Sequence, residues 1–250
     1  MTTIRGARER ARTEVTAAIK DEARRQLAAE GAARLSLRAV ARELGMVSSA
    51  LYRYFPSRDD LLTALIVDAY DAVGSAAEGA LAVGGPAGSA TSVGSAAERA
   101  GHAEPVDHVG CWTAVCAAVR AWALAHPHEY ALIYGSPVPG YSAPQLTVAP
   151  ASRVALALIS IAEDAQRVGE ITPPALSDEL RPEAERLTAQ FGFGLPPEVV
   201  AALVASWAQL FGLISFEVFG QFNKLVEARD ELFAQATRRL AHDVGMRDAG

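Results

Sequence analysis

The 250-residue chain contains few cysteines, and they do not form a recognisable metal or disulfide pattern. Only Cys111 and Cys116 are present, five residues apart. This spacing matches neither a zinc site nor a disulfide scaffold. We therefore expect both thiols to be small buried apolar groups or walls of a ligand pocket, and we predict no cofactor.

Long apolar runs are also absent. No stretch of 18 or more residues is apolar without interruption, which argues against a membrane-spanning helix. The N-terminal segment MTTIRGARERARTEV carries charges where a signal peptide needs an apolar region. We therefore expect a cytoplasmic protein without a membrane partner.

The signatures of common enzymes are missing as well. The chain has no G-x-S-x-G elbow, no P-loop and no H-E-x-x-H motif, and GFG at 192–194 lacks the third glycine of a dinucleotide loop. HPHE at 126–129 places two histidines and a carboxylate too close together in a helix-breaking turn to converge on one ion. The sequence predicts neither an enzyme nor a metal site.

Charge is distributed unevenly along the chain. The formal net charge is -6, yet residues 1–60 carry 12 Lys and Arg against 8 Asp and Glu, while the remainder carries 11 against 21. Positive charge is therefore concentrated at one end. This arrangement lets an acidic protein attract a polyanion locally.

Apolar positions recur three and four residues apart along most of the chain, and strand signals are nearly absent, so the sequence predicts an all-α fold. Its length is sufficient for a large buried core. Before the glycine-rich stretch at 84–104, which we expect to be a flexible loop, the pattern predicts helices over Arg10–Glu30, from the N-cap Ser36 to Gly45, over Ser48 to about Phe55, and from near Arg58 toward Leu81. After that loop it predicts helices over Val106–Ala125, Pro127–Gly135 and Arg153–Gln166, a short one ending at Phe191, one from Pro197, and one over Val226–Val244.

The two short helices around Gly45 have the spacing of a helix-turn-helix, whose second helix lies in the DNA major groove. In SLRAVARELGMVSSALYRYFPSRDD we expect Val47, Leu51 and Phe55 to point inward. The residues left outside are Ser48, Ser49, Tyr52, Arg53 and Tyr54. Guanidinium and hydroxyl groups suit guanine edges and phosphate oxygens. The alternative is an ordinary helical hairpin with a solvated polar face.

The segment from Pro197 to Lys224 contains only two charged groups before Lys224, so a helix there would be apolar around most of its circumference. One globular core covers only part of such a surface, and two copies of the chain would cover the rest. The predicted homodimer interface consists of Val200, Val204, Trp207, Ile214, Val218, Leu232, Ala236 and Leu240. The alternative is a helix buried inside a larger monomeric core.

Several aromatic side chains in the second half of the chain are candidates for a ligand pocket, because small-molecule sites are usually apolar with a few orienting polar groups. The predicted lining residues are Trp112, Cys116, Trp122, Tyr130, Tyr134, Trp207 and Phe211. The same residues could equally form the core.

The segment from Leu35 to Ile66 closely resembles the DNA-binding domain of TetR/AcrR-type bacterial transcriptional regulators. Its sequence is LSLRAVARELGMVSSALYRYFPSRDDLLTALI, and the resemblance includes the LYxxF core of the short helix. The resemblance implies that Ser36 and Arg38 approach phosphates and that Arg58 clamps another. It implies that Ser48, Ser49 and Arg53 face the groove, with Tyr52 and Tyr54 on the DNA backbone. The family often has His in place of Tyr54 and Lys in place of Arg58; both replacements keep a donor.

A second, less extensive resemblance concerns RAWALAHPHEYALIYG, Arg120 to Gly135, which looks like the C-terminal domain called WHG. Trp122, His126 and Gly135 are its namesakes here. For His126 the alternative is a structural role at the junction of two helices.

Together these features predict a helix-turn-helix DNA-binding domain over residues 1–56 and a helical effector-binding and dimerisation domain over 57–250. The resemblance implies a homodimeric repressor on a pseudo-palindromic double-stranded DNA operator, released by a small, mainly apolar effector. Two alternatives stay open. The first is a regulator of the same fold that answers to a protein partner or to no ligand, and the second is a helical ligand-binding protein that no longer binds DNA.

Overall fold

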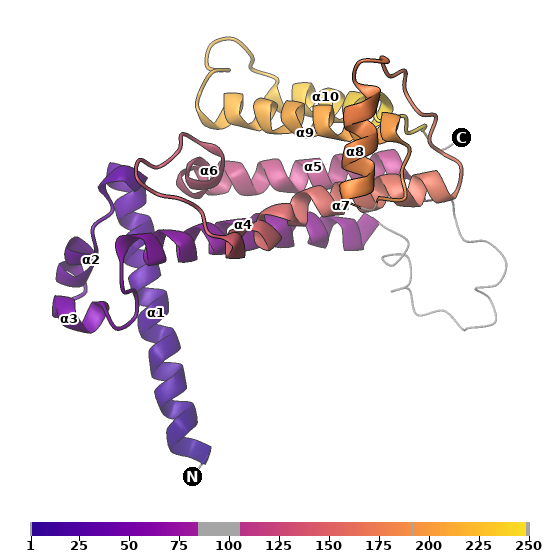
Figure 1. Cartoon of the computed structure of the whole chain (residues 1–250). Helices are drawn as coiled ribbons and strands as arrows, with labels where there is room; N and C mark the ends of the chain where they lie inside the picture. Colours follow the sequence, from indigo (N-terminus) through magenta and orange to yellow (C-terminus); the bar gives the residue numbers. More distant parts are fainter. Residues whose placement is uncertain (1, 85–105, 192, 249–250) are drawn as a thin grey trace, which may run out of the picture. The chain divides into compact units, whose positions relative to one another are not determined.

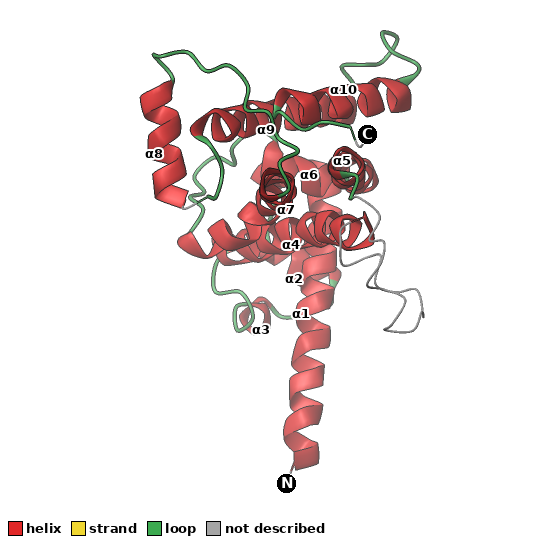
Figure 2. Ribbon diagram, turned by 90° about the vertical axis from the view of Figure 1, so that its right-hand side faces the viewer, coloured by secondary structure: helices red, strands yellow, loops and turns green. Residues whose placement is uncertain are grey.

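The computed structural model describes residues 2–84, 106–191 and 193–248. Within these ranges every regular element is a helix, as Figure 2 shows, and the one strand-like pairing is an isolated antiparallel bridge between Ile171 and Met246. The predicted all-α fold is therefore confirmed. The predicted loop at 84–104 lies outside the described residues except for Gly84, the last residue of a helix.

The chain divides into two compact units. Unit 1 comprises residues 1–71 and 126–151, and unit 2 comprises residues 72–125 and 152–250. Two helices, Arg58–Gly84 and Val148–Arg167, begin in unit 1 and end in unit 2. The predicted domain boundary after residue 56 stays a prediction, because this division follows packing and not independent folding.

In unit 1, two short helices pack against longer ones. Its elements are α1 (Thr2–Glu30), the 3-10 turn η1 (Ala32–Arg34), α2 (Leu37–Glu43), α3 (Ser48–Leu51), the start of α4 (Arg58–Gly84), α6 (Pro127–Tyr134) and the 3-10 turn η3 (Gln145–Thr147). Figure 1 shows α2 and α3 beside α1, whose N-terminal part extends beyond them. Ile19, Val40, Leu51 and Leu61 are fully buried in the core that joins these helices.

Local signals set both ends of α2 and the start of α4 as the sequence predicted. The Oγ atom of Ser36 accepts a hydrogen bond from the backbone nitrogen of Ala39, 3.4 Å away, and caps α2. Gly45 ends this helix with φ of +63°, a conformation that disfavours side chains with a Cβ. Ser57 caps α4, since its Oγ accepts from the backbone nitrogen of Asp60 at 3.1 Å.

Two predictions about α3 are wrong. The α-helix ends at Leu51 and continues as turns, and not as helix to Phe55. Pro56 disfavours helical conformation in Phe55, the residue before it. Val47 is 69% exposed and does not point inward. It lies in extended backbone before the helix begins, so its side chain does not follow the helical period that buries Leu51 and Phe55.

Unit 2 is a bundle of longer helices. It contains the end of α4, α5 (His108–Ala125), most of α7 (Val148–Arg167), α8 (Arg181–Phe191), α9 (Pro197–Val218) and α10 (Arg229–Asp243). The helix α10 packs against α5 and α9, and α8 packs against α9. All the helices predicted after the loop are present, although α7 begins five residues before the predicted start at Arg153.

Polar groups fasten α5 inside unit 2. The guanidinium of Arg120 donates to both carboxylate oxygens of Glu217 at 2.6 and 2.7 Å, and it pairs with Asp230 at 2.7 Å. The Nδ1 atom of buried His108 lies 2.6 Å from Oε2 of Glu170. These contacts join α5 to α9, to the start of α10 and to the segment that follows α7.

Among the described residues, three helical segments are long and apolar enough to cross a membrane by length and composition alone. They are His108–Ala125, Gln145–Arg167 and Pro197–Val218, and 50%, 33% and 39% of their most apolar windows are buried in the fold. The sequence analysis found no membrane-spanning helix because it required an uninterrupted apolar run, and these segments contain interruptions. In unit 2 the incomplete burial of α9 leaves an apolar surface on the protein.

Candidate nucleic-acid interface and ligand cavity

The predicted DNA-contacting side chains are mostly exposed on α2, α3 and the turn after α3. Arg38, Ser48, Ser49, Tyr52 and Arg53 are exposed, whereas Ser36, Tyr54 and Arg58 are half-buried. The burial of Leu51 and Phe55 fixes which side of α3 is turned outward. Two arginines and three hydroxyl groups are thus available for phosphate oxygens and base edges. Their individual roles on DNA stay predictions.

Tyr54 contacts a residue of α1, which the sequence pattern did not indicate. The guanidinium carbon of Arg12, on α1, lies 5.9 Å from the centroid of the Tyr54 ring, within the range of a cation–π contact. Since α1 and the turn after α3 are distant in sequence, periodicity could not have paired them. This contact holds a basic side chain beside the predicted interface.

Arg58 has contacts within the protein that the resemblance did not imply. Its Nη2 donates to the carbonyl oxygen of Ala32 at 2.8 Å, and its Nε donates to that of Leu35 at 3.2 Å. These bonds fasten the start of α4 to the connection between α1 and α2. The predicted phosphate contact of Arg58 stays a prediction.

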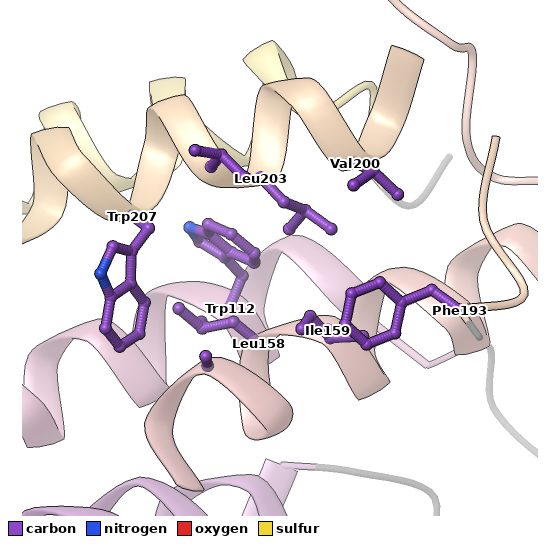
Figure 3. Close-up of a pocket in the computed structure, with 9 residues that line it drawn as sticks. Trp112, Leu158, Ile159, Phe193, Val200, Leu203 and Trp207 are labelled. Carbon is purple, nitrogen blue, oxygen red and sulfur yellow. The ribbon is translucent and has the colours of Figure 1, made fainter. Parts of the chain in front are cut away.

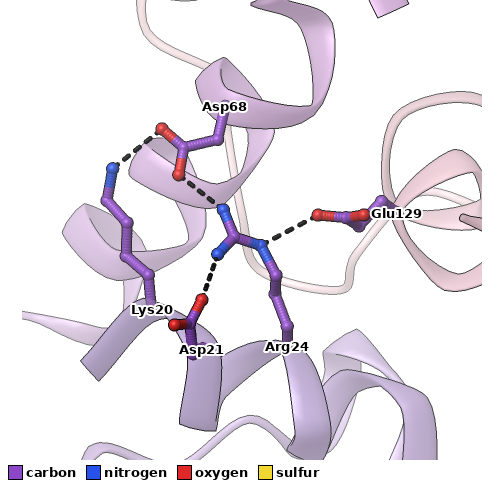
Figure 4. Close-up of polar contacts among 5 residues, drawn as sticks. All are labelled: Lys20, Asp21, Arg24, Asp68 and Glu129. Atoms are coloured by element: carbon purple, nitrogen blue, oxygen red, sulfur yellow. Dashed lines mark hydrogen bonds and ion pairs between the residues drawn. The ribbon is translucent and has the colours of Figure 1, made fainter. Parts of the chain in front are cut away.

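A cluster of ion pairs joins three helices of unit 1 (Figure 4). On α1, Arg24 donates to Asp68 of α4 at 2.7 Å, to Glu129 of α6 at 2.8 Å, and to Asp21 of α1 itself at 2.8 Å. Lys20 also binds Asp68, at 2.8 Å. We call these five residues the Arg24 cluster.

The carboxylate of Glu129 is therefore engaged with a guanidinium. Across the described ranges, no group of three or more His, Cys, Asp or Glu side chains is placed to hold a metal ion.

The conformation at the end of α6 depends on Gly135, its C-cap, because a Cβ atom there would collide with the carbonyl oxygen of Ala131.

Unit 2 contains an apolar cavity of about 230 Å³ between α5, α7 and α9 (Figure 3). The lining residues are Trp112, Ala155, Leu158, Ile159, Phe193, Val200, Leu203, Val204 and Trp207. None of them carries a charge. The indole nitrogen of Trp112 is buried without a hydrogen-bond partner. The cavity can therefore accept an apolar molecule but offers no charged partner.

Two of the seven predicted ligand residues, Trp112 and Trp207, line this cavity. The remaining five do not: Cys116, Trp122, Tyr130, Tyr134 and Phe211. Cys116 and Tyr130 are fully buried, and Tyr134 packs against Tyr130 and Tyr70 in unit 1 with centroid distances of 5.2 and 5.9 Å. In these cases the core alternative describes the surroundings better.

Most of the cavity wall was missed because it is aliphatic. Ala155, Leu158 and Ile159 have the ordinary spacing of a buried face on α7, and nothing in that pattern separates a cavity wall from a filled core. Val200 and Val204 were predicted in a dimer interface instead. Only the convergence of α5, α7 and α9 distinguishes these positions.

The two cysteines are buried, and neither forms a disulfide. Removal from water raises the pKa of the Cys116 thiol far above its ordinary value, and the same effect, with help from Asp107 and Asp164, raises the pKa of Cys111. Both side chains therefore stay protonated and behave as small apolar groups, as predicted.

The predicted dimer residues fall into two sets. Val200, Ile214 and Leu240 are buried inside the single chain, so they already serve its core. Val204 and Leu232 are exposed, whereas Trp207, Val218 and Ala236 are half-buried. Further apolar surface on or directly after α9 comes from Phe216 and Phe219. A groove of about 420 Å³ lies between α9 and α10, with Phe216 in its wall.

Comparisons with known proteins agree with this architecture. Residues 19–65 match the family model described as "Bacterial regulatory proteins, tetR family", and residues 112–240 match "Tetracyclin repressor-like, C-terminal domain". The helix-turn-helix transcriptional regulator Rv1816 of Mycobacterium tuberculosis is 40% identical over 227 residues, covering 87% of this chain and 86% of that protein.

Solved structures show the same fold. A protein named SCO4313, described as regulatory, is 31% identical with a TM-score of 0.72, covering 94% of this chain and 98% of that one. A tetR-family regulatory protein from Rhodococcus RHA1 has a TM-score of 0.60 at 15% identity, covering 93% of this chain and 98% of that one, which supports the fold alone.

The matched N-terminal segment contains the helix-turn-helix, and the matched C-terminal segment contains α6 and the α5, α7 and α9 cavity walls. Together with the relative at 40% identity, these matches account for almost all of the described helices. The chain belongs to the TetR family of bacterial transcriptional regulators and is not an enzyme.

Proposed function

We propose that the protein is a cytoplasmic homodimeric repressor whose operator affinity falls when a small, mainly apolar molecule binds in unit 2. The observation that carries this proposal is the uncharged cavity bounded by α5, α7 and α9 in a DNA-binding regulator. A regulator without a ligand has no need to keep such a space open, because filling it would stabilise the core.

On the DNA side, the exposed residues Arg38, Tyr52 and Arg53 supply contacts to phosphates and bases. Because phosphate contacts release condensed counterions, affinity for DNA falls steeply as salt rises. Two such units related by a two-fold axis contact half-sites about 34 Å apart, one turn of the double helix.

The apolar surface of α9 supplies the dimer contact. Only 39% of its most apolar window is buried in one chain, and Val204, Phe216 and Phe219 are exposed. A symmetric partner covers such a surface with the same surface of its own. The interface expected here therefore centres on these exposed residues and excludes the buried Val200, Ile214 and Leu240.

Release of the repressor from its operator requires that the ligand bind more tightly to a conformation in which the two DNA-binding units do not match the spacing of the half-sites. A 100-fold loss of operator affinity corresponds to about 2.7 kcal/mol of preference, which is within the usual range of coupling free energies. In this proposal α4 carries the change, since this continuous helix belongs to unit 2 at its end and to unit 1 at its start. In unit 1 the Arg24 cluster then relays the position of α4 to α1 and α6.

The test begins with selection of bound DNA from a random pool by the purified protein. We expect an enriched pseudo-palindrome, to which binding is then measured by fluorescence anisotropy at several salt concentrations. A screen of apolar compounds by thermal shift identifies ligands, because a ligand of the folded state raises its stability by mass action. Each ligand found is added to the protein–DNA complex, and we expect the operator affinity to fall.

Arg53→Ala and Arg167→Ala form a matched pair for this assay. Both remove one exposed arginine, but Arg167 lies in unit 2 and pairs with Asp164 on the same helix. We expect Arg53→Ala to weaken operator binding about 10- to 100-fold and Arg167→Ala to leave it unchanged. Absence of any enriched sequence at low salt, or equal effects of the two variants, would count against the proposal.

A further inference from the structure

The cavity walls restrict the charge of any molecule that binds there. Its nine lining side chains are aliphatic or aromatic, and none is Asp, Glu, Lys, Arg or His. An ion that enters loses its water and gains no opposite charge, which is strongly unfavourable. A ligand of this cavity is therefore neutral.

The volume of the cavity restricts the size of the ligand. At about 230 Å³ it is larger than the ~150 Å³ apolar cavities that hold benzene. It is smaller than the range from about 300 Å³ upward that is usual for drug-sized ligands. One ring with a short substituent fits between these limits.

One polar group in the wall lacks a partner. Trp112 is 1% exposed, and its Nε1–H donates to no acceptor, although burial of an unsatisfied donor is unfavourable. Figure 3 shows the Trp112 indole among the lining side chains, with Leu203 and Trp207 as labelled neighbours. Protein atoms cover this nitrogen, so an acceptor on a ligand in the cavity reaches it only after the neighbouring side chains move.

We propose that this cavity binds a neutral, single-ring organic molecule with one hydrogen-bond acceptor, and that Trp112 donates its indole N–H to that acceptor. The inference rests on the proposed function, because it names the chemical class of the effector. Its test needs no DNA. Trp112 is thus a specificity-determining residue, and the remaining wall selects only for size and lack of charge.

Three probes of similar size separate the features of this ligand class. Ethylbenzene has the ring without an acceptor, acetophenone adds a neutral carbonyl oxygen, and benzoate carries a negative charge. Binding to the full-length protein is measured by isothermal titration calorimetry. We expect acetophenone to bind about 3- to 10-fold tighter than ethylbenzene, as one neutral hydrogen bond allows, and benzoate to bind at least about 100-fold more weakly.

Trp112→Phe and Trp207→Phe are matched variants, since each removes one indole N–H from the same cavity wall. Trp207 is half-exposed, and its nitrogen is not among the buried unpartnered atoms. We expect Trp112→Phe to abolish the preference for acetophenone over ethylbenzene, and Trp207→Phe to retain it. A preference that survives in Trp112→Phe, benzoate binding as tight as that of acetophenone, or no binding of either neutral probe would overturn the inference.

A measurement on the unaltered protein covers the case in which Trp112→Phe does not fold. The chain has three tryptophans, so a ¹⁵N spectrum shows three indole N–H signals. Acetophenone should shift one signal strongly downfield, and ethylbenzene should not; equal shifts with both probes would refute the hydrogen bond. If the calorimetric pattern is found while operator affinity is unchanged, this inference stands and the proposed release mechanism fails.

Discussion

Two arginines near the helix-turn-helix illustrate how position within the fold separates side chains of the same type. Arg53 is exposed after α3, with its guanidinium available to a partner. Arg58, five residues later, donates to the carbonyl oxygens of Ala32 and Leu35 and holds the α1–α2 connection against α4. We therefore expect the first residue to matter mainly for DNA binding and the second mainly for stability.

Replacement of each arginine by alanine tests this difference. Arg58→Ala should lower the free energy of unfolding by about 1.5–3 kcal/mol, because it removes hydrogen bonds from a charged donor to backbone carbonyls. Arg53→Ala, at an exposed position, should change it by no more than about 0.5 kcal/mol. Urea unfolding measures both. Unchanged stability of Arg58→Ala together with a large loss of DNA affinity would restore the phosphate-clamp role that the family resemblance implied.

At the scale of elements, Gly74 permits the close contact of α4 with α7 in unit 2. A Cβ atom at this position would lie 2.7 Å from the Cβ of Arg153. The Arg153 side chain then crosses to α4 and donates to Glu78 at 2.6 and 2.8 Å. Gly79, on the same helix, has open space where its Cβ would be.

Gly74→Ala and Gly79→Ala should therefore have opposite effects on stability. Alanine favours a helix over glycine by about 1 kcal/mol, so Gly79→Ala should stabilise the protein by up to that amount. Gly74→Ala should destabilise it by about 1–3 kcal/mol, because the overpacked contact forces α4 and α7 apart. Thermal unfolding of both variants provides the comparison, and a stabilised Gly74→Ala would show that this contact yields easily.

The Arg24 cluster connects α1, α4 and α6. In the proposed mechanism it transmits the movement of α4 on ligand binding to the other two helices. Its side chains are partly exposed, so each pair contributes less than about 1 kcal/mol to stability. Its importance would lie in the difference between two arrangements of the helices and not in the strength of one pair.

Glu129→Gln and Asp21→Asn separate these two effects. Each removes one negative charge that contacts Arg24, but Asp21 lies on α1 with Arg24, whereas Glu129 belongs to α6. We expect Glu129→Gln to reduce the effect of a ligand on operator affinity by about 0.5–2 kcal/mol, and Asp21→Asn to leave that effect unchanged. Anisotropy titrations with and without ligand measure both, and equal behaviour of the two variants would exclude a special role for the link to α6.

At the scale of the whole molecule, the proposed function depends on a second copy of the chain. Phe216 is 53% exposed on α9 and lines the groove between α9 and α10. Burial of such apolar surface favours association, and a buried unpaired carboxylate opposes it. DNA binding by a symmetric pair also requires both half-sites to be occupied together.

Phe216→Glu should therefore produce monomers at micromolar concentration in analytical ultracentrifugation. The same variant should bind a full operator at least about 100-fold more weakly, because the two DNA-binding units are no longer linked. Leu146→Glu is the control, since Leu146 is similarly exposed but lies in unit 1. A dimeric Phe216→Glu protein would place the interface elsewhere.

The helix-turn-helix could be predicted in detail because its signals are local. The cap at Ser36 and the positive φ of Gly45 depend on residues a few positions away, and the spacing of Leu51 and Phe55 indicates which face is buried. Val47 was misplaced because its backbone is extended, which breaks the helical period on which the prediction relied. The hydrogen bonds of Arg58 to backbone carbonyls are not predictable from the local pattern, because the acceptors lie 23 to 26 residues earlier.

The sequence by itself determined the all-α fold, most helix boundaries, the DNA-binding motif and the family. Periodicity, caps and glycine turns act within one or two helical turns, so they can be predicted from the sequence. Tertiary structure alone decided which apolar residues of α5, α7 and α9 line a cavity, which arginine binds carbonyl oxygens, and which face of α9 stays exposed. The reason is physical: an apolar residue has the same local preferences in a core, a cavity wall or an interface, and only packing between distant segments distinguishes them.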